Sequence, residues 1–147
     1  MQRKNAFTLV ELLIIVIILG ILAAVVIPQF SDASTDARLS SLTTNLQTIR
    51  GQLDLYRLQH NGVYPTQANV VNQMTQKTDV DGTVNVAGKY GPYLQRIPNN
   101  PFTIGGTGND ITNTAAASNK AWYYDATTGS FKANNGGSTN GVAHDTL

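Results

Sequence analysis

Apolar residues are concentrated near the N-terminal end of the chain. From Phe7 to Ile27 the sequence holds a single ionisable residue, Glu11. As a helix, this segment would be about 31 Å long at 1.5 Å per residue, which is enough to cross a bilayer. It is also longer than the apolar core of a removable secretory signal, which has roughly 7–15 residues. The pattern therefore predicts a membrane-spanning helix that stays in the protein.

A helical period of apolar residues follows Pro28. The stripe comprises Phe30, Ala33, Ala37, Leu42, Leu46, Ile49, Leu53 and Tyr56. Such spacing is typical of one helix face, and we expect Leu42–Tyr56 to form core against a sheet. A proline inside the pattern predicts a kink or a helix boundary. The pair Asn61-Gly62 predicts the helix end.

Two short strand patterns lie near the C-terminal end. The segments Ala121–Asp125 and Ser130–Ala133 flank a turn that ends in Gly129, which predicts a β-hairpin. Trp122 and Tyr124 would share one face, and we expect that face to be core rather than a ligand-stacking surface. The predicted fold class is α+β, with a long N-terminal α-helix that packs through its second half on a small antiparallel β-sheet domain.

The stretch between helix and hairpin carries weaker signals. Its prolines predict that Gly91–Phe102 is an irregular, conformationally restricted loop or a sheet edge. Proline has no backbone N–H to donate to a neighbouring strand, so it is excluded from central strands. The stretch Thr103–Asn119 is rich in Gly, Thr, Asn and Ala and predicts an insertion or an exposed loop.

Composition removes several classes of function. The formal net charge is +1, so bulk electrostatics do not favour a nucleic-acid binder, and the absence of cysteine excludes disulfides and thiolate chemistry. His60 and His144 lie in no catalytic or metal motif, and His60 suits the carbonyl end of a helix. Asp79 and Asp81 have the spacing of a calcium-loop start, but the loop's final glutamate is missing, so a solvated turn is expected. We predict no enzyme.

Glu11 is unusual because a carboxylate within an apolar span costs free energy unless it reaches water or a cation. Arg3 and Lys4 favour a cytoplasmic location for the N-terminal end of the helix. Glu11 could then extend into the lipid headgroups at the cytoplasmic edge of the membrane. Alternatively, cleavage between Ala6 and Phe7 would create an amine four residues upstream. In a bundle of identical helices, that amine could pair with Glu11 of a neighbouring subunit.

The string Ala6-Phe7-Thr8-Leu9-Val10-Glu11-Leu12, followed by an apolar helix, resembles the N-terminus of type IV pilins and type II secretion pseudopilins. The resemblance implies that a prepilin peptidase cuts between Ala6 and Phe7 and methylates the new Phe7 amine. It makes Glu11 the assembly residue and places Gly20 and Pro28 at positions of helix flexibility. Alanine stands at position 6 where the family usually has glycine.

The resemblance divides the chain into residues 1–6 (leader), 7–30 (membrane and filament-core helix), 31–61 (amphipathic second half of the helix) and 62–147 (periplasmic loop and sheet domain). Tyr64-Pro65 and Gly91–Phe102 resemble segments of major pseudopilins. The resemblance therefore implies a structural subunit of a helical filament, the major pseudopilin of a type II secretion system. The alternatives are a type IV pilin of surface pili and, from another class, a single-span anchor with a small binding domain.

The resemblance also implies partners and a location. The partners are further copies of the chain, the prepilin peptidase, the inner-membrane assembly platform with its ATPase, and minor pseudopilins. The chain would cross the inner membrane once with its C-terminal domain in the periplasm, and nucleic acid would matter only for a DNA-uptake pilin. No cofactor is expected. Calcium is possible by family resemblance, but the tail Asn134–Asp145 holds one acid and we assign no metal.

Overall fold

A single long helix, α1 (Leu9–Gln59), dominates the N-terminal part of the chain. The computed structural model describes residues 7–103, 108–114 and 120–147. The chain divides into two compact units, of which the first ends at Ala37 and the second comprises Arg38–Leu147. The helix continues through Pro28, so the helix boundary that the sequence allowed there is not present.

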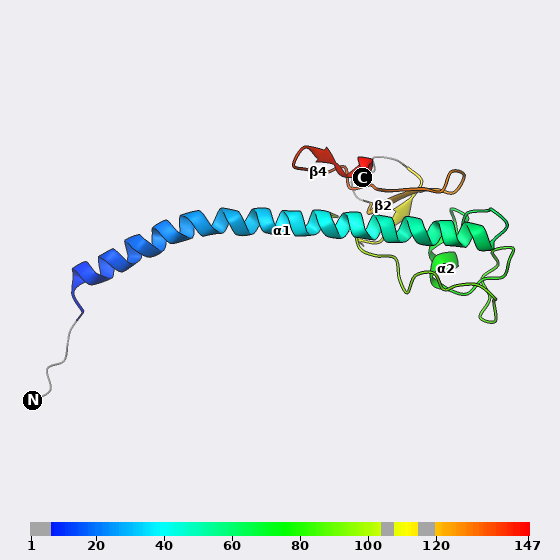
Figure 1. The fold of residues 1–147 in the computed structure, drawn as a ribbon, viewed down its shortest axis with the longest axis horizontal. Helices are drawn as coiled ribbons and strands as arrows, with labels where there is room; N and C mark the ends of the chain where they lie inside the picture. Colours follow the sequence, from blue (N-terminus) through cyan, green and yellow to red (C-terminus); the bar gives the residue numbers. More distant parts are fainter. Residues whose placement is uncertain (1–6, 104–107, 115–119) are drawn as a thin grey trace, which may run out of the picture. The chain divides into compact units, whose positions relative to one another are not determined.

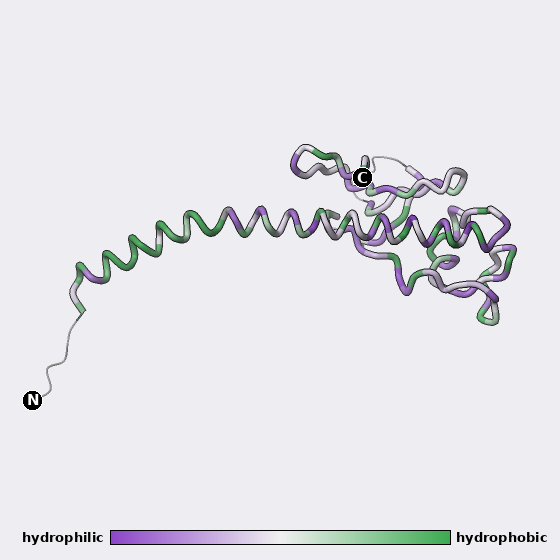
Figure 2. The backbone as a smooth tube through the Cα atoms, in the orientation of Figure 1, coloured by the Kyte–Doolittle hydropathy of each residue, from purple (hydrophilic) through white to green (hydrophobic). Residues whose placement is uncertain are grey.

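The first unit presents its apolar side chains to the surroundings. Figure 2 shows predominantly hydrophobic colouring along the N-terminal part of α1. The large apolar side chains from Leu9 to Ile27 are all exposed. By length and composition, this helix can cross a membrane.

The helix ends where the sequence predicts. Asn61 and Gly62 both adopt positive φ, at 56° and 83°. The Gly62 N–H donates to the Arg57 carbonyl at 2.9 Å, which closes the last turn. The expected stop at Asn61-Gly62 is therefore confirmed.

A short helix and irregular segments follow. Helix α2 spans Val70–Thr75. Thr78 then forms isolated bridges to Val84 and Tyr90. The proline-spaced segment Gly91–Phe102 contains no regular strand, as expected. It is held to α2 because the N–H groups of Tyr93 and Leu94 both donate to the Met74 carbonyl.

The main sheet has three strands in the order β1-β2-β3. Strands β2 (Trp122–Asp125) and β3 (Ser130–Ala133) pair antiparallel, which confirms the predicted hairpin. Strand β1 (Ile111–Thr112) pairs parallel to β2, so the sheet is mixed. Within the stretch Thr103–Asn119, expected to be an insertion or an exposed loop, residues 104–107 and 115–119 lie outside the described residues. In the described part, the expectation of an exposed loop is wrong at β1, because Ile111 and Thr112 are half-buried and pair with β2.

The hairpin turn is covered by an aromatic ring. Gly129 has φ +73°, and a Cβ built on it would lie 2.2 Å from the Tyr64 ring. Only glycine fits this combination of conformation and space. Tyr64, which follows α1, thus packs directly on the β2–β3 turn.

The C-terminal residues form a second, smaller hairpin. Strand β4 (Ser138–Thr139) pairs antiparallel with β5 (Val142–Ala143), and a 3₁₀ turn, η1 (His144–Thr146), follows. The backbone N–H of His144 donates to the Gly137 carbonyl at 3.0 Å.

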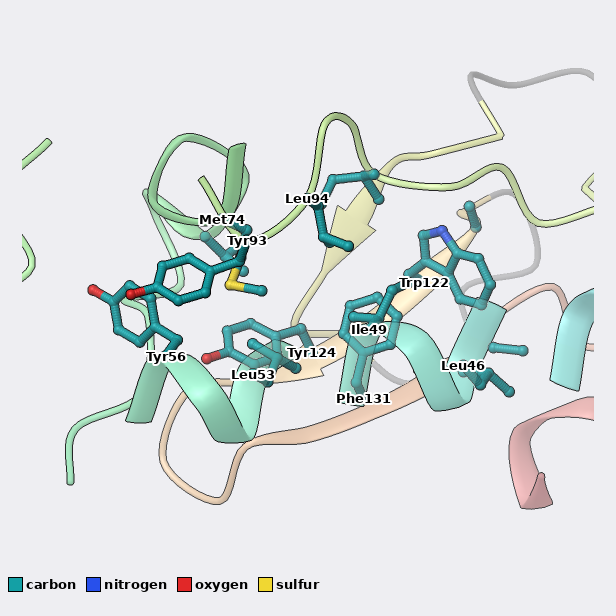
Figure 3. Close-up of a cluster of buried hydrophobic side chains, with 14 of the residues drawn as sticks. Leu46, Ile49, Leu53, Tyr56, Met74, Tyr93, Leu94, Trp122, Tyr124 and Phe131 are labelled. Atoms are coloured by element: carbon teal, nitrogen blue, oxygen red, sulfur yellow. The ribbon is translucent and has the colours of Figure 1, made fainter. Parts of the chain in front are cut away.

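The core of the second unit lies between α1 and the sheet. Figure 3 shows Leu46, Ile49, Leu53 and Tyr56 of α1 facing Trp122, Tyr124 and Phe131 of the sheet, with Met74, Tyr93 and Leu94. Strand β2 lies against the C-terminal part of α1 in this core (Figure 1). The stripe is buried from Leu42 onward, as predicted. The earlier members of the stripe, Phe30, Ala33 and Ala37, are exposed in the single chain. They are exposed because the core of the second unit begins after them.

Candidate functional site

The first turn of α1 forms a reciprocal cap between Thr8 and Glu11. The Thr8 N–H and hydroxyl both donate to Glu11 Oε2, at 2.9 and 2.8 Å. The Glu11 N–H lies 3.3 Å from Thr8 Oγ1. This is a capping box, in which a Thr at the N-cap and a Glu three residues later satisfy unpaired N–H groups of the helix start.

The cap explains part of why a carboxylate is tolerated at position 11. The sequence pattern alone predicts only lipid headgroups or a neighbour's amine as partners of Glu11. The missed signal is the spacing Thr8-Leu9-Val10-Glu11, which is the sequence signature of a capping box. Both Thr8 bonds reach Oε2, and an ionised carboxylate can accept about four hydrogen bonds. The group therefore has capacity for a further donor.

Among the other residues singled out from the sequence, Phe7 adjoins this cap. Phe7 precedes it and is 74% exposed. Ala6 lies outside the described residues. Gly20 lies within α1, and a Cβ built on it meets no atom within 4 Å, so no packing within the chain requires glycine there. Pro28 is also within α1, and the flexibility expected at both positions stays a prediction.

His60 is a structural residue at the end of α1. Its ring stacks on Tyr56, with 3.7 Å between the ring centroids. Its Nδ1 donates to the Tyr56 carbonyl at 2.7 Å, and its Nε2 pairs with Thr78 Oγ1 at 2.9 Å. The expected interaction with the carbonyl end of the helix is confirmed, and the ring also ties α1 to the segment after α2.

His144 is also buried, in a polar network that the sequence did not indicate. Its Nδ1 lies 2.8 Å from the Asn135 amide nitrogen, and its Nε2 lies 2.8 Å from Thr139 Oγ1. The Phe102 ring packs against it at 4.2 Å between centroids. Burial lowers the pKa of His144 below its usual value, while the adjacent Asp145 carboxylate opposes this shift.

The acidic pair at Asp79 and Asp81 forms a turn, as the sequence predicts. The Thr83 N–H donates to Asp81 Oδ1 at 2.9 Å, and this bond lowers the pKa of the exposed Asp81 carboxyl. The Gly82 N–H donates to the Asp79 carbonyl. Across residues 7–103, 108–114 and 120–147, no three His, Cys, Asp or Glu side chains come together as metal ligands would.

The Arg50 side chain links α1 to the edge strand β3. Arg50 Nε donates to the Phe131 carbonyl at 3.0 Å, and its terminal nitrogen donates to the Leu147 carbonyl oxygen at 2.7 Å. Strand β3 therefore has one of its carbonyl groups satisfied by a helix side chain. Together with the core, this contact fixes the sheet on the helix.

Comparison with known proteins agrees with these features. A model of the prokaryotic N-terminal methylation motif matches residues 1–27, which include the capped helix start. A model of the type II secretion system protein G matches residues 29–121, which include the second half of α1, the irregular segments and β1.

The chain is also similar to individual proteins. The type II secretion system core protein G of Pseudomonas aeruginosa is 33% identical over 69% of this chain and 72% of its own length. The protein of that name from Vibrio cholerae is 32% identical over 69% of this chain and 68% of its own length. The one from Klebsiella pneumoniae is 29% identical, with coverages of 69% and 71%. No solved structure matches significantly. The chain belongs to the type II secretion system protein G family.

Proposed function

We propose that this chain is the major pseudopilin of a type II protein secretion system, a structural subunit that polymerises into a helical filament. The observation that carries the proposal is the exposed apolar surface of Phe7 and of α1 from Leu9 to Ile27. A helical surface of this kind needs either lipid or other helices around it. The family membership and the match to the methylation motif support both surroundings: lipid before assembly and other helices in the filament.

The filament requires a processed N-terminus. A prepilin peptidase would remove residues 1–6 by cutting between Ala6 and Phe7, and would methylate the Phe7 amine. Arg3 and Lys4 leave with the leader, so the charges that favour a cytoplasmic N-terminal end act only before cleavage. The match to the methylation motif over residues 1–27 supports this step.

Assembly would pair the new amine with Glu11 of a neighbouring subunit. Because Thr8 occupies one carboxylate oxygen of Glu11, the other oxygen is the acceptor that we assign to the amine. The cap then orients the carboxylate before the neighbour arrives. Both ionic groups become partnered in an apolar surrounding, where an isolated charge is costly.

The transfer of α1 from lipid to neighbouring helices gains little from the hydrophobic effect, because lipid tails are as apolar as the helix surface. Packing and the ionic pair supply the specificity, and the extraction needs external work. An ATPase-driven platform in the inner membrane is the partner class that supplies such work. Minor pseudopilins and further copies of the chain complete the assembly, with the C-terminal domain in the periplasm.

Two measurements test this proposal. Intact mass of the membrane-extracted chain should show loss of residues 1–6 and one added methyl group, whereas Ala6→Leu should retain the leader and Ala6→Gly should not. Electron microscopy of overproducing cells should show filaments of this subunit. A full-length, unmethylated chain that forms no filaments would contradict the proposal and favour a single-span membrane anchor with a binding domain.

A further inference from the structure

The C-terminal segment, Asn134–Leu147, is closed by a series of hydrogen bonds that starts in the core. Asn100 Nδ2 donates to the Ala121 carbonyl at 2.9 Å and to Asn135 Oδ1 at 3.2 Å. Asn135 Nδ2 then lies 2.8 Å from His144 Nδ1, and His144 Nε2 lies 2.8 Å from Thr139 Oγ1. The series joins Ala121, the residue before β2, to Thr139 of β4 and to His144 of η1.

The donors and acceptors in this series fit one protonation state of His144. The amide oxygen of Asn135 faces Asn100, so its nitrogen must face the imidazole. An amide nitrogen only donates, which makes His144 Nδ1 an acceptor and places the ring proton on Nε2, from where it donates to Thr139. The imidazole is therefore neutral.

Most of the network is removed from water, although Asn135 is only half-buried. His144 is 2% exposed and Asn100 is 3% exposed. The Phe102 ring covers one face of the imidazole. The exposed Asp145 carboxylate lies on the same turn, and the Arg50 side chain of α1 binds the Leu147 carbonyl oxygen further along the chain. A buried polar network in which each member is satisfied specifies one arrangement of the chain.

Family resemblance implies calcium in this segment, but the residues here do not fit that ion. Calcium takes about 6–8 oxygen ligands. The segment has one carboxylate, Asp145, and the amide oxygen of Asn135 is already bonded to Asn100. The backbone of Gly137 fills the space beside the network, since a Cβ built there would lie 2.7 Å from Asn135 Nδ2 and 3.2 Å from His144 Nδ1.

We propose that the C-terminal segment of this protein keeps its fold without calcium, and that the imidazole of His144 is the group that closes it. The side chain performs the bridging that a cation performs when it gathers oxygen ligands from separate turns. It joins Asn135, before β4, to Thr139, within β4, and through Asn100 it links both to the core. The inference goes beyond filament formation and does not depend on it.

The test uses the full chain in detergent micelles. Trp122 is the single tryptophan of the chain and is fully buried, so its fluorescence reports unfolding of the second unit alone. Hydrogen exchange at the His144 amide, which is bonded to the Gly137 carbonyl, reports local opening of the segment. Both are measured with millimolar calcium and with EDTA.

We expect the unfolding midpoint and the His144 exchange rate to be equal in calcium and in EDTA. His144→Ala should lower the folding equilibrium constant about 10- to 100-fold, because it leaves buried polar groups unpaired. Asp145→Asn, the matched control at the neighbouring exposed position, should change it less than about threefold.

Two results would overturn the inference. One is a wild-type midpoint that falls in EDTA and recovers with calcium. The other is a chain in which Asp145→Asn opens the segment while His144→Ala does not. If His144→Ala fails to fold, Thr139→Val is used instead, because it removes one bond of the same network. The inference then predicts faster hydrogen exchange at the His144 amide, and unchanged exchange would contradict it. Neither result bears on filament formation, which is measured separately.

Discussion

Glu11 has two partners in this account, and substitutions can separate them. Within the chain its carboxylate accepts two hydrogen bonds from Thr8 and caps α1. Between chains it would accept the Phe7 amine of a neighbour. Thr8→Ala removes most of the cap and keeps the charge. Glu11→Gln keeps an acceptor that still works in a capping box but removes the charge.

The expected magnitudes differ enough to be told apart. Loss of an N-cap hydroxyl costs about 1 kcal/mol, which corresponds to about a fivefold change in an equilibrium constant. Removing one member of a buried ion pair costs about 3–5 kcal/mol, because the other charge is left without a partner. At 1.4 kcal/mol per factor of ten, this is a loss of about two to three and a half orders of magnitude in subunit incorporation.

The assay compares filament and membrane pools in cells that contain the whole assembly system. Subunits in sedimentable filaments and subunits in the membrane are quantified by immunoblot for each variant. Thr8→Ala should form filaments at no less than about a fifth of the wild-type amount. Glu11→Gln should insert into the membrane normally and be almost absent from filaments.

The opposite ranking would refute the reasoning. If Glu11→Gln assembles at wild-type levels while Thr8→Ala does not, the carboxylate acts only as a helix cap. Intact mass of both variants serves as the control, because each must first show cleavage before Phe7 for its assembly to be compared.

Three further predictions concern the second unit, and each is followed by Trp122 fluorescence during urea unfolding. Leu53→Ala removes a fully buried side chain from the α1 stripe and should cost about 2–5 kcal/mol with an unchanged m-value; a cost below about 1 kcal/mol would contradict the packing described. Gly129→Ala should destabilise by more than about 1 kcal/mol, because the methyl group would overlap the Tyr64 ring in a backbone conformation that disfavours alanine, and a neutral effect would contradict that contact. Because burial lowers the pKa of His144, the unfolded chain binds a proton at a pH where the folded chain does not. The free energy of unfolding should therefore fall as the pH drops below about 6.5, and level off below the folded-state pKa. His144→Phe should flatten this part of the stability profile.

The long helix and the hairpin could be predicted because their signals are local. The apolar run and the stripe from Leu42 to Tyr56 have helical spacing, and the aromatic alternation at Trp122–Tyr124 has strand spacing. The sequence could not show that Phe30 remains uncovered, because helical spacing continues through both units while the core occupies only the second.

The missed features depend on contacts between segments far apart in the chain. Strand β1 has two residues and exists because β2 is beside it, so its composition alone resembles a loop. The burial of His144 depends on Asn100 and Asn135, which no local spacing connects to it. The cap at Thr8 is different, since its spacing to Glu11 is local and could have been recognised.

The proposed assembly depends on Glu11 of one subunit binding the processed Phe7 amine of another. A helical reconstruction of the purified filament that resolves side chains measures this contact directly. We expect the Phe7 nitrogen to lie within hydrogen-bond distance of Glu11 in an adjacent subunit, with Thr8 still bound to the same carboxylate. A Glu11 side chain bonded only to its own Thr8, with the neighbouring amine elsewhere, would contradict it.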